Sequence, residues 1–174
     1  MTRLETERLL LRPPTLDDVE AAGELLGDPE VMRFIGGSIA PREAWPTIVE
    51  RWMFRWEANG PIPFVVERRA DGRFVGRVGM HVWDTRTWVP STWADAGAFG
   101  QPELGWALAR AMWGSGYATE AARAVREWVQ VDSLVSVIAP GNVASQRVAE
   151  KLGAAPGETV RLFDTGDAVV WRYF

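Results

Sequence analysis

Residues 110–122 read R-A-M-W-G-S-G-Y-A-T-E-A-A, and they place two glycines between a strand pattern and a helix pattern. Residues 103–108 before them have the apolar content of a strand, and residues 118–130 carry apolar side chains on one helical face. Gly114 and Gly116 therefore lie in a loop that leads directly into a helix. Glycine lets the backbone approach a ligand closely, and the N–H groups and dipole of a helix N-terminus favour an anion. The stretch predicts a cradle for a phosphate or pyrophosphate.

The loop lacks the residues of two common nucleotide-binding motifs. A P-loop needs Gly-Lys-Ser or Gly-Lys-Thr, whereas Gly116 is followed by Tyr117 and Ala118. A dinucleotide fingerprint needs a small third residue where Thr119 stands, and its strand normally opens the domain instead of lying past the middle. A glycine-rich turn without any ligand is the remaining alternative, and a second motif bears on it.

The second motif is N-V-A-S-Q-R-V-A-E-K-L-G at residues 142–153, directly after the apolar strand pattern of residues 134–138. Asn142 suits a helix N-cap, and Ser145 falls in the first turn of that helix. Gly153 suits the end of the helix. Taken alone, these residues describe an ordinary capped helix.

The rest of the chain alternates strand and helix patterns. We expect strands at residues 8–12, 62–69 and 74–83 and in two terminal segments. We also expect a helix that is capped at Thr15 and ends at Gly27, and a longer helix from Pro41 to about residue 58. Between these helices, residues 28–37 are expected to form a short helix and a turn. Residues 85–100 have no clear period and are expected to form a long loop or irregular hairpin beside a cleft. The alternation in the second half implies a parallel strand pair with a crossover helix. The fold class is α/β or mixed α+β, in one domain over residues 1–174.

Composition excludes several classes of function. A net charge of −4 gives no positive field for nucleic acid, and the absence of cysteine excludes disulfides, thiolate metal sites and a cysteine nucleophile. A lone histidine, His81, excludes a multi-histidine metal site within one chain. No apolar run is long enough to span a bilayer, and the first residues lack the apolar core of a secretory signal. We expect a cytoplasmic protein with no metal and with no nucleic-acid or membrane partner.

In combination, the two motifs resemble the GNAT acetyltransferase superfamily, in particular the branch of the ribosomal-protein-alanine N-acetyltransferases. The resemblance runs through T-E-R-L-L-L-R at residues 6–12, E-L-G-W at 103–106, W-G-S-G-Y-A-T-E-A at 113–121, the motif at 142–153, and Trp171. It covers almost the whole chain. The fold that it implies is a central, mostly antiparallel mixed sheet of about six to seven strands, flanked by helices and containing a splayed parallel pair.

The resemblance implies acetyl-CoA as co-substrate, with its pantetheine arm lying between the splayed strands. The implied cofactor-binding residues form three groups. The strand contributes Trp106, Ala107 and Leu108, and the region near the thioester contributes Asn142 and Ser145. The pyrophosphate cradle consists of Trp113, Gly114, Ser115, Gly116, Tyr117, Ala118 and Thr119. Ala111 stands where many family members have Gln or Arg, and Arg110 is the adjacent basic residue that would supply charge instead.

The implied reaction is direct attack of a neutral amine on the thioester, which requires proton removal from the amine, donors to the oxyanion and a proton for the thiolate. Glu103 is the first candidate for the base, and it is equally a candidate to anchor its strand or bind substrate. Ser145 is the candidate donor near the sulfur, because Gly153 and Ala154 stand where the family usually has a tyrosine. His81 has the better unperturbed pKa for a base, but a lone histidine on a strand is more often structural.

The acceptor stays open among a peptide N-terminus, an aminoglycoside, a polyamine and an amino acid. Asp84 and Asp95 flank the tryptophan-rich residues 83–99 and are candidates to hold a cationic acceptor. That stretch is either an aromatic wall for the acceptor or a hydrophobic loop packed on the core or on a second subunit, which leaves a homodimer open. The predicted function is N-acetylation of a primary amine on a peptide or small molecule. The alternatives are an acetyl-CoA-binding or sensing module without transfer and, least supported, an interaction protein that docks through its tryptophans.

Overall fold

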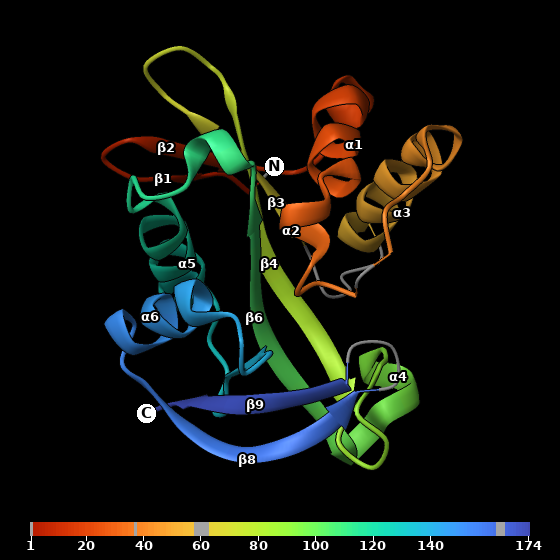
Figure 1. Cartoon of the computed structure of the whole chain (residues 1–174), viewed down its shortest axis with the longest axis vertical. Coiled ribbons are helices and arrows are strands. Elements are labelled where there is room, and N and C mark those ends of the chain that lie inside the picture. The colour runs from red at the N-terminus through yellow and green to blue at the C-terminus, as the bar shows by residue number, and fades with distance from the viewer. Residues whose placement is uncertain (1, 37, 58–62, 163–165) are drawn as a thin grey trace.

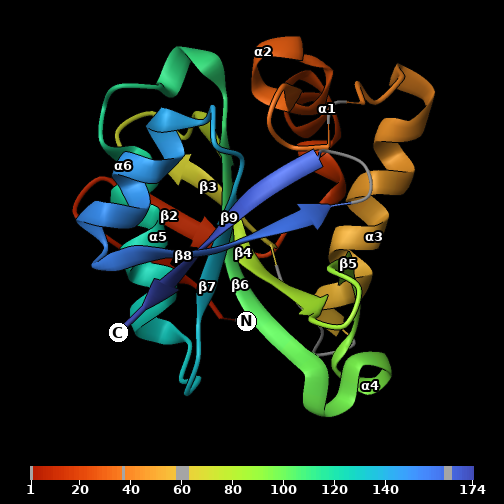
Figure 2. The same cartoon turned by 60° about the horizontal axis from the view of Figure 1, so that its bottom comes forward.

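The computed structural model describes residues 2–36, 38–57, 63–162 and 166–174. In these residues a mixed sheet runs through the molecule and helices cover both of its faces (Figure 1; Figure 2). The strands are β1 (Leu4–Glu5), β2 (Leu9–Arg12), β3 (Pro63–Arg68), β4 (Phe74–Asp84), β5 (Val89–Pro90), β6 (Gly100–Leu108), β7 (Val135–Ile138), β8 (Ala154–Leu162) and β9 (Gly166–Tyr173). Their order is β1-β2-β3-β4-β6-β7-β9-β8, with β5 paired to β4.

The helices are α1 (Val19–Gly27), α2 (Pro29–Met32), α3 (Trp45–Glu57), α4 (Trp93–Ala96), α5 (Tyr117–Trp128) and α6 (Val143–Lys151). Helices α5 and α6 lie on one face of the sheet, and α1, α2 and α3 lie on the other (Figure 1). None of the helices in the described ranges is long and apolar enough to cross a membrane.

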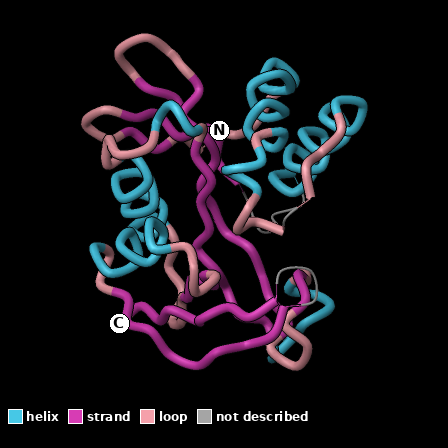
Figure 3. The backbone as a smooth tube through the Cα atoms, in the orientation of Figure 1, coloured by secondary structure: helices cyan, strands magenta, loops and turns pink. Residues whose placement is uncertain are grey.

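Strands β4 and β6 form the longest ladder and run side by side through the middle of the molecule (Figure 3). The pair β6–β7 is parallel, and the other described pairs are antiparallel. This confirms the mixed, mostly antiparallel sheet with one parallel pair. Two of the strands, β1 and β5, are only two residues long, so the longer strands match the expected sheet size.

The main core lies between the sheet and α5. Buried side chains from β2, β3, β4 and β6 meet the small buried face of α5, namely Leu9, Leu11, Phe64, Val78 and Leu104 against Ala121, Ala122 and Val125. This α5 face has the helical spacing that the sequence predicts. The packing holds the N-terminus of α5 beside the end of β6, which positions the predicted cradle.

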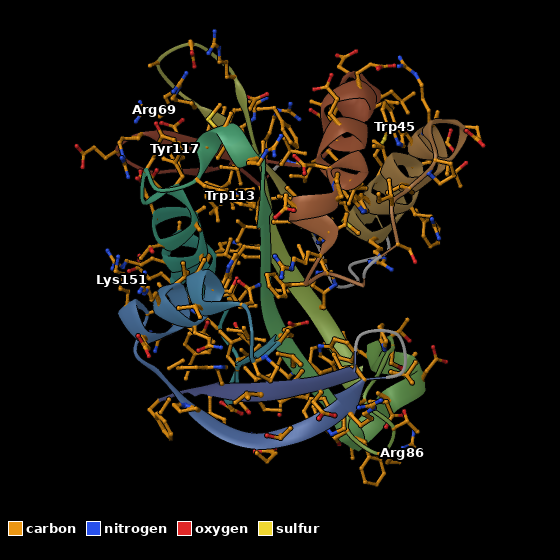
Figure 4. All side chains as sticks on the ribbon, in the orientation of Figure 1. Trp45, Arg69, Arg86, Trp113, Tyr117 and Lys151 are labelled. Atoms are coloured by element: carbon orange, nitrogen blue, oxygen red, sulfur yellow. The ribbon has the colours of Figure 1, made fainter. Side chains whose placement is uncertain are left out.

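The opposite face carries α1 to α3, and α1 and α3 touch at a glycine. The Trp45 side chain lies between the two helices (Figure 4), and a Cβ atom added to Gly23 would fall 1.9 Å from its ring. Helix α1 is fixed to the sheet through Arg12, which donates at 2.7 Å to the buried carboxylate of Asp18. Burial raises the pKa of Asp18, but hydrogen bonds from Arg12 and Thr15 outweigh burial and leave this pKa below its ordinary value.

Residues 85–100 form an irregular hairpin, which is one of the two expected forms. β5 pairs with the end of β4, α4 follows, and the chain returns as β6. β6 begins at Gly100, earlier than the expected residue 103, because its first residues continue the ladder with the end of β4. The expected helix end at residue 58, the strand start at 62 and the turn end at 37 lie outside the described residues.

We predict that Gly23→Ala destabilises the protein although alanine favours helices by about 1 kcal/mol over glycine. The added methyl group would overlap the Trp45 ring, and overpacking of this kind costs about 1–3 kcal/mol. The matched control is Gly27→Ala in the same helix, where the nearest Trp45 atom is 3.5 Å from the added Cβ. Urea unfolding should show a lower free energy of unfolding for Gly23→Ala and an unchanged or higher one for Gly27→Ala. Equal values for the two variants would contradict this packing.

Candidate active site

A cleft of about 380 Å³ opens where β6 and β7 part. The two strands share a single ladder pair, Glu103 with Val135, and beyond it they diverge. The cleft is lined by residues 104–106 of β6, by Ser136, Val137, Ile138 and Ala139, and by Asn142 and Ser145 at the start of α6. It extends over β4 to the segment after α2 and to β5. We call this space the splay cleft.

The backbone of Trp106 faces the open side of β6. The Leu104 carbonyl accepts a hydrogen bond from Ser136 Oγ at 2.6 Å, so Leu104 is turned toward β7. In an antiparallel ladder, alternate residues turn both backbone groups toward the partner strand or away from it. Trp106 therefore shares the direction of Leu104 and faces the gap, whereas Ala107 is turned toward its partner Arg77 on β4.

The loop before α5 has the geometry of an anion cradle. Gly114 and Gly116 have φ values of 76° and 81°, which favour glycine, and no atom lies within 4 Å of a Cβ added at Gly114. Gly116 is the N-cap of α5 and has no side chain to accept from the first-turn N–H groups. These groups, in Tyr117, Ala118 and Thr119, thus remain available to a ligand.

The aromatic residues at the two ends of the cradle are anchored differently. Trp113 Nε1 donates to the Leu108 carbonyl at 2.8 Å, while the Trp113 side chain stays exposed. This bond occupies one lone pair of the Leu108 carbonyl, whereas no side chain of the described residues bonds the backbone of Trp106. Tyr117 is buried beneath the loop, and Figure 4 shows both aromatic side chains beside the start of α5.

Arg8 brings positive charge to the cradle, and the sequence analysis did not identify it. Its guanidinium donates to the Ser115 carbonyl at 2.9 Å and lies 4.7 Å from the centre of the Tyr117 ring. An ion pair with Glu120 at 2.6 Å holds it in place. Arg110, the residue expected to supply this charge, is also ion-paired, with Asp28 at 3.3 Å. Arg8 differs from it in its direct hydrogen bond to the cradle backbone.

Glu103 is 8% exposed, and its carboxylate joins β6 to β7 at the point where they part. It accepts from Trp83 Nε1 at 2.6 Å through one oxygen and from the Val137 backbone N–H at 3.2 Å through the other. Burial raises the pKa of Glu103, and the two hydrogen bonds and the charge of Arg77 only partly offset that rise. The carboxylate thus anchors the strands and also lines the splay cleft.

His81 lies opposite Glu103 in the β4–β6 ladder, but its surroundings make it a weak base. Its Nε2 is 3.2 Å from Arg77 Nη1, and because a guanidinium only donates, Nε2 is the acceptor and the proton is on Nδ1. Burial and the positive charges of Arg77 and Arg55 lower the pKa of His81 to about 3. The imidazole is therefore neutral at ordinary pH.

Asn142 and Ser145 meet at the start of α6. Asn142 is the N-cap, and its Oδ1 accepts from the Ser145 backbone N–H at 3.2 Å. Ser145 Oγ accepts from Trp106 Nε1 at 3.2 Å across the cleft. Since the hydroxyl oxygen receives that bond, its own proton is left to donate to another group.

A tyrosine lies near the cleft but is engaged elsewhere. Tyr173 on β9 bonds Ser136 Oγ at 2.8 Å, and because Ser136 already donates to Leu104, the tyrosine hydroxyl is the donor. Burial raises the pKa of Tyr173 to about 12. No tyrosine is among the described residues that line the splay cleft.

The tryptophan-rich segment divides between the cleft and the surface. Trp83 and Trp88 line the splay cleft with ring centres 6.4 Å apart, whereas Trp93 is exposed. Asp84 is paired with Arg86 at 2.5 Å, and Asp95 accepts from Thr92 at 2.7 Å. Neither aspartate lines the cleft, so the structure does not bring these expected acceptor contacts into the site.

Comparison with known proteins identifies the family. Residues 8–155 match the model of the acetyltransferase (GNAT) domain. The Bacillus subtilis (strain 168) protein YkkB is 33% identical, with the alignment covering 98% of this chain and 95% of that protein. An acetyltransferase from Agrobacterium tumefaciens str. C58 has a TM-score of 0.78 at 28% identity, covering 100% of this chain and 95% of its own.

RimL is a ribosomal L7/L12 alpha-N-protein acetyltransferase that was solved in complex with coenzyme A. It has the same fold, with a TM-score of 0.78 at 12% identity, and the match covers 99% of this chain and 98% of RimL. The family match includes the loop before α5, the parting strands and the start of α6. The chain therefore belongs to the GNAT acetyltransferase family and is an acyltransferase.

Proposed function

We propose that this chain acts as one acetyltransferase domain over residues 1–174 and moves the acetyl group of acetyl-CoA to a primary amine, either a protein or peptide N-terminus or an amine of a small molecule. The observation that carries the proposal is the splay cleft, which contains the gap-facing backbone of Trp106 and the buried carboxylate of Glu103. From the Trp106 end of the cleft, β6 continues into the glycine loop before α5. The coenzyme A complex of RimL, which has the same fold, supports the choice of cofactor.

The residues of the site fit acetyl-CoA along its length. First-turn N–H groups after Gly114 and Gly116 would hold the pyrophosphate, and the Arg8 guanidinium would add positive charge beside it. The backbone N–H and C=O of Trp106 would bond the pantetheine arm as a neighbouring strand does. Asn142 and Ser145 would lie near the thioester, which supplies the activated acetyl group when the cofactor is bound.

Glu103 is suited to take the proton of the acceptor amine. Each of its oxygens accepts one protein hydrogen bond and keeps a further lone pair, so it receives a proton directly or through one water. Its raised pKa improves the match to an amine. Ser145 would donate its free proton to the departing sulfur as a hydrogen bond, because an alcohol is a weak acid.

The second candidate function is an acetyl-CoA-binding module without acetyl transfer. The hydrogen bond between Tyr173 and Ser136 favours this function, because no tyrosine among the described residues that line the cleft is then placed to protonate the thiolate. Release of free thiol from acetyl-CoA, measured against a library of primary amines, separates the two functions. Turnover above background hydrolysis supports transfer, and tight binding with no turnover on any amine supports the binding module.

We predict that Gly116→Ala weakens acetyl-CoA binding by placing a side chain in the cradle and straining a left-handed residue. Gly72→Ala in the β3–β4 turn is the matched control, since Gly72 also has a positive φ, of 68°, and its Cβ would enter open space. Both substitutions should cost about 1–2 kcal/mol of stability. Isothermal titration should show a higher Kd for acetyl-CoA in Gly116→Ala and an unchanged Kd in Gly72→Ala. Equal Kd values in both variants would argue against the cradle.

We predict that Glu103→Gln lowers kcat/KM by about 10²–10⁴-fold, the usual contribution of a general base. A base must be unprotonated to act, so wild-type activity should fall as pH drops through the raised pKa of Glu103, and the variant should lack this acid limb. Trp83→Phe removes a hydrogen bond that lowers this pKa, so its acid limb should move to higher pH.

A purely anchoring role for Glu103 predicts a different result. Glu103→Gln would then lower the melting temperature while keeping the acid limb of the pH–rate profile. Thermal unfolding of each variant, measured beside the kinetics, distinguishes the two roles.

A further inference from the structure

A second cavity, of about 310 Å³, lies between α3 and β4. Its polar lining includes Arg51 and Arg55 from α3 and Arg77 and His81 from β4. Arg77 and His81 also line the splay cleft, so the two cavities meet at these side chains. We call the second space the arginine cavity.

The arginine cavity gathers three positive charges, and the carboxylate that acts on one of them, Glu103 on Arg77, is not in direct contact with it. Among the described residues, none of its three arginines is in an ion pair. Arg51 and Arg55 stand one helical turn apart, a spacing at which like charges repel. Partial burial lowers the pKa of Arg55, and the charge of Arg51 lowers it further. Burial also lowers the pKa of Arg77, where the negative charge of Glu103 offsets part of the effect and the charge of Arg55 adds to it. The folded chain therefore bears a repulsion that an anion would relieve.

One arginine also has an unsatisfied hydrogen-bond donor. Arg77 Nε is buried and has no partner among the described residues. The Arg77 guanidinium lies 5.6 Å from the centre of the Trp52 ring, which orients it without satisfying its N–H groups. An unpaired buried donor destabilises the folded chain, and it does so more when the group is charged. A guanidinium fork is shaped to bind carboxylate and phosphate oxygens.

The arginine cavity adjoins the group proposed to take the amine proton. His81 Nε2 is 3.2 Å from Arg77 Nη1, and in the β4–β6 ladder His81 is directly opposite Glu103. Residues directly opposite on antiparallel strands have Cβ atoms about 5 Å apart. An anion held by Arg77 would thus be close enough to Glu103 for one small molecule or terminal dipeptide to reach both.

We propose that the arginine cavity binds a carboxylate or phosphate group of the acceptor, so that the preferred acceptors are amines that carry a nearby anion. This inference rests on the proposed acetyl transfer. It reverses the expectation of a cationic acceptor held by Asp84 and Asp95, because those aspartates are hydrogen-bonded within their own segment, whereas Arg77 lines both the splay cleft and the arginine cavity.

The chain contains a built-in reporter for this site. His81 is its single histidine, so the imidazole proton signals in a ¹H NMR spectrum belong to that residue alone. We would titrate the protein with inorganic phosphate and, separately, with acetate, against sodium chloride at equal ionic strength. Each titration would be repeated in saturating coenzyme A, which separates an acceptor site from a cofactor-phosphate site.

Arg51→Gln/Arg55→Gln is the test variant, because both residues lie at the surface of α3, with Arg55 partly covered, and both are outside the proposed catalytic and cofactor sites. Arg73→Gln is the control, since it removes a positive charge from an exposed position in the β3–β4 turn, one charge against the two of the test variant. The expected result is a saturable shift of the His81 signal with phosphate, acetate or both, unchanged by coenzyme A. The Kd should rise by at least about tenfold in the double variant and stay constant in Arg73→Gln.

A shift no larger than that with chloride, its loss in coenzyme A, or an unchanged Kd in the folded double variant would overturn the proposal. A response to acetate alone assigns the site to carboxylates, and a response to phosphate alone assigns it to phosphates. The titration involves no turnover. A failed anion site therefore leaves acetyl transfer standing, and a protein that binds phosphate but acetylates no amine contradicts acetyl transfer alone.

Discussion

The parting of β6 from β7 after one parallel pair is the constraint on which the site depends. A continued ladder would pair the backbone of both strands, but here two side chains end it, with Ser136 bonding the Leu104 carbonyl and Glu103 accepting the Val137 N–H. The next gap-facing backbone, at Trp106, is left open beside a cleft. Because backbone polar groups need hydrogen-bond partners, an extended ligand arm is a natural occupant of the gap.

The order of elements then places each part of the site. β6 leads into the glycine loop and α5, so a ligand lying along β6 meets the helix N-terminus at one end, and α6 begins across the gap with Asn142 and Ser145. α5 is also the crossover that returns the chain to the parallel strand β7. The neighbouring strand β4 carries Arg77 and His81, which line both the splay cleft and the arginine cavity.

Local patterns made the fold and the glycine loop before α5 predictable. The loop has positive φ values at residues 114 and 116, which favour glycine there. Asn142 caps α6, as asparagine commonly does, and the buried face of α5 has helical spacing. The contacts that sequence reasoning missed join residues far apart. Arg8 and Glu120 are 112 residues apart, and no local pattern signals their pairing across the cradle. The weak basicity of His81 and the gathering of arginines depend in the same way on α3 packing over β4, which only the folded chain reveals.

Amide hydrogen exchange with and without acetyl-CoA tests the central claim most directly, because the splay cleft is defined by backbone groups. Binding in the gap should slow exchange at the Trp106 amide and in the first turn of α5, while β8 and the β3–β4 turn exchange as before. Saturation with acetyl-CoA that leaves the Trp106 amide unprotected, or that protects amides elsewhere instead, would contradict the claim that the cofactor lies between the parted strands.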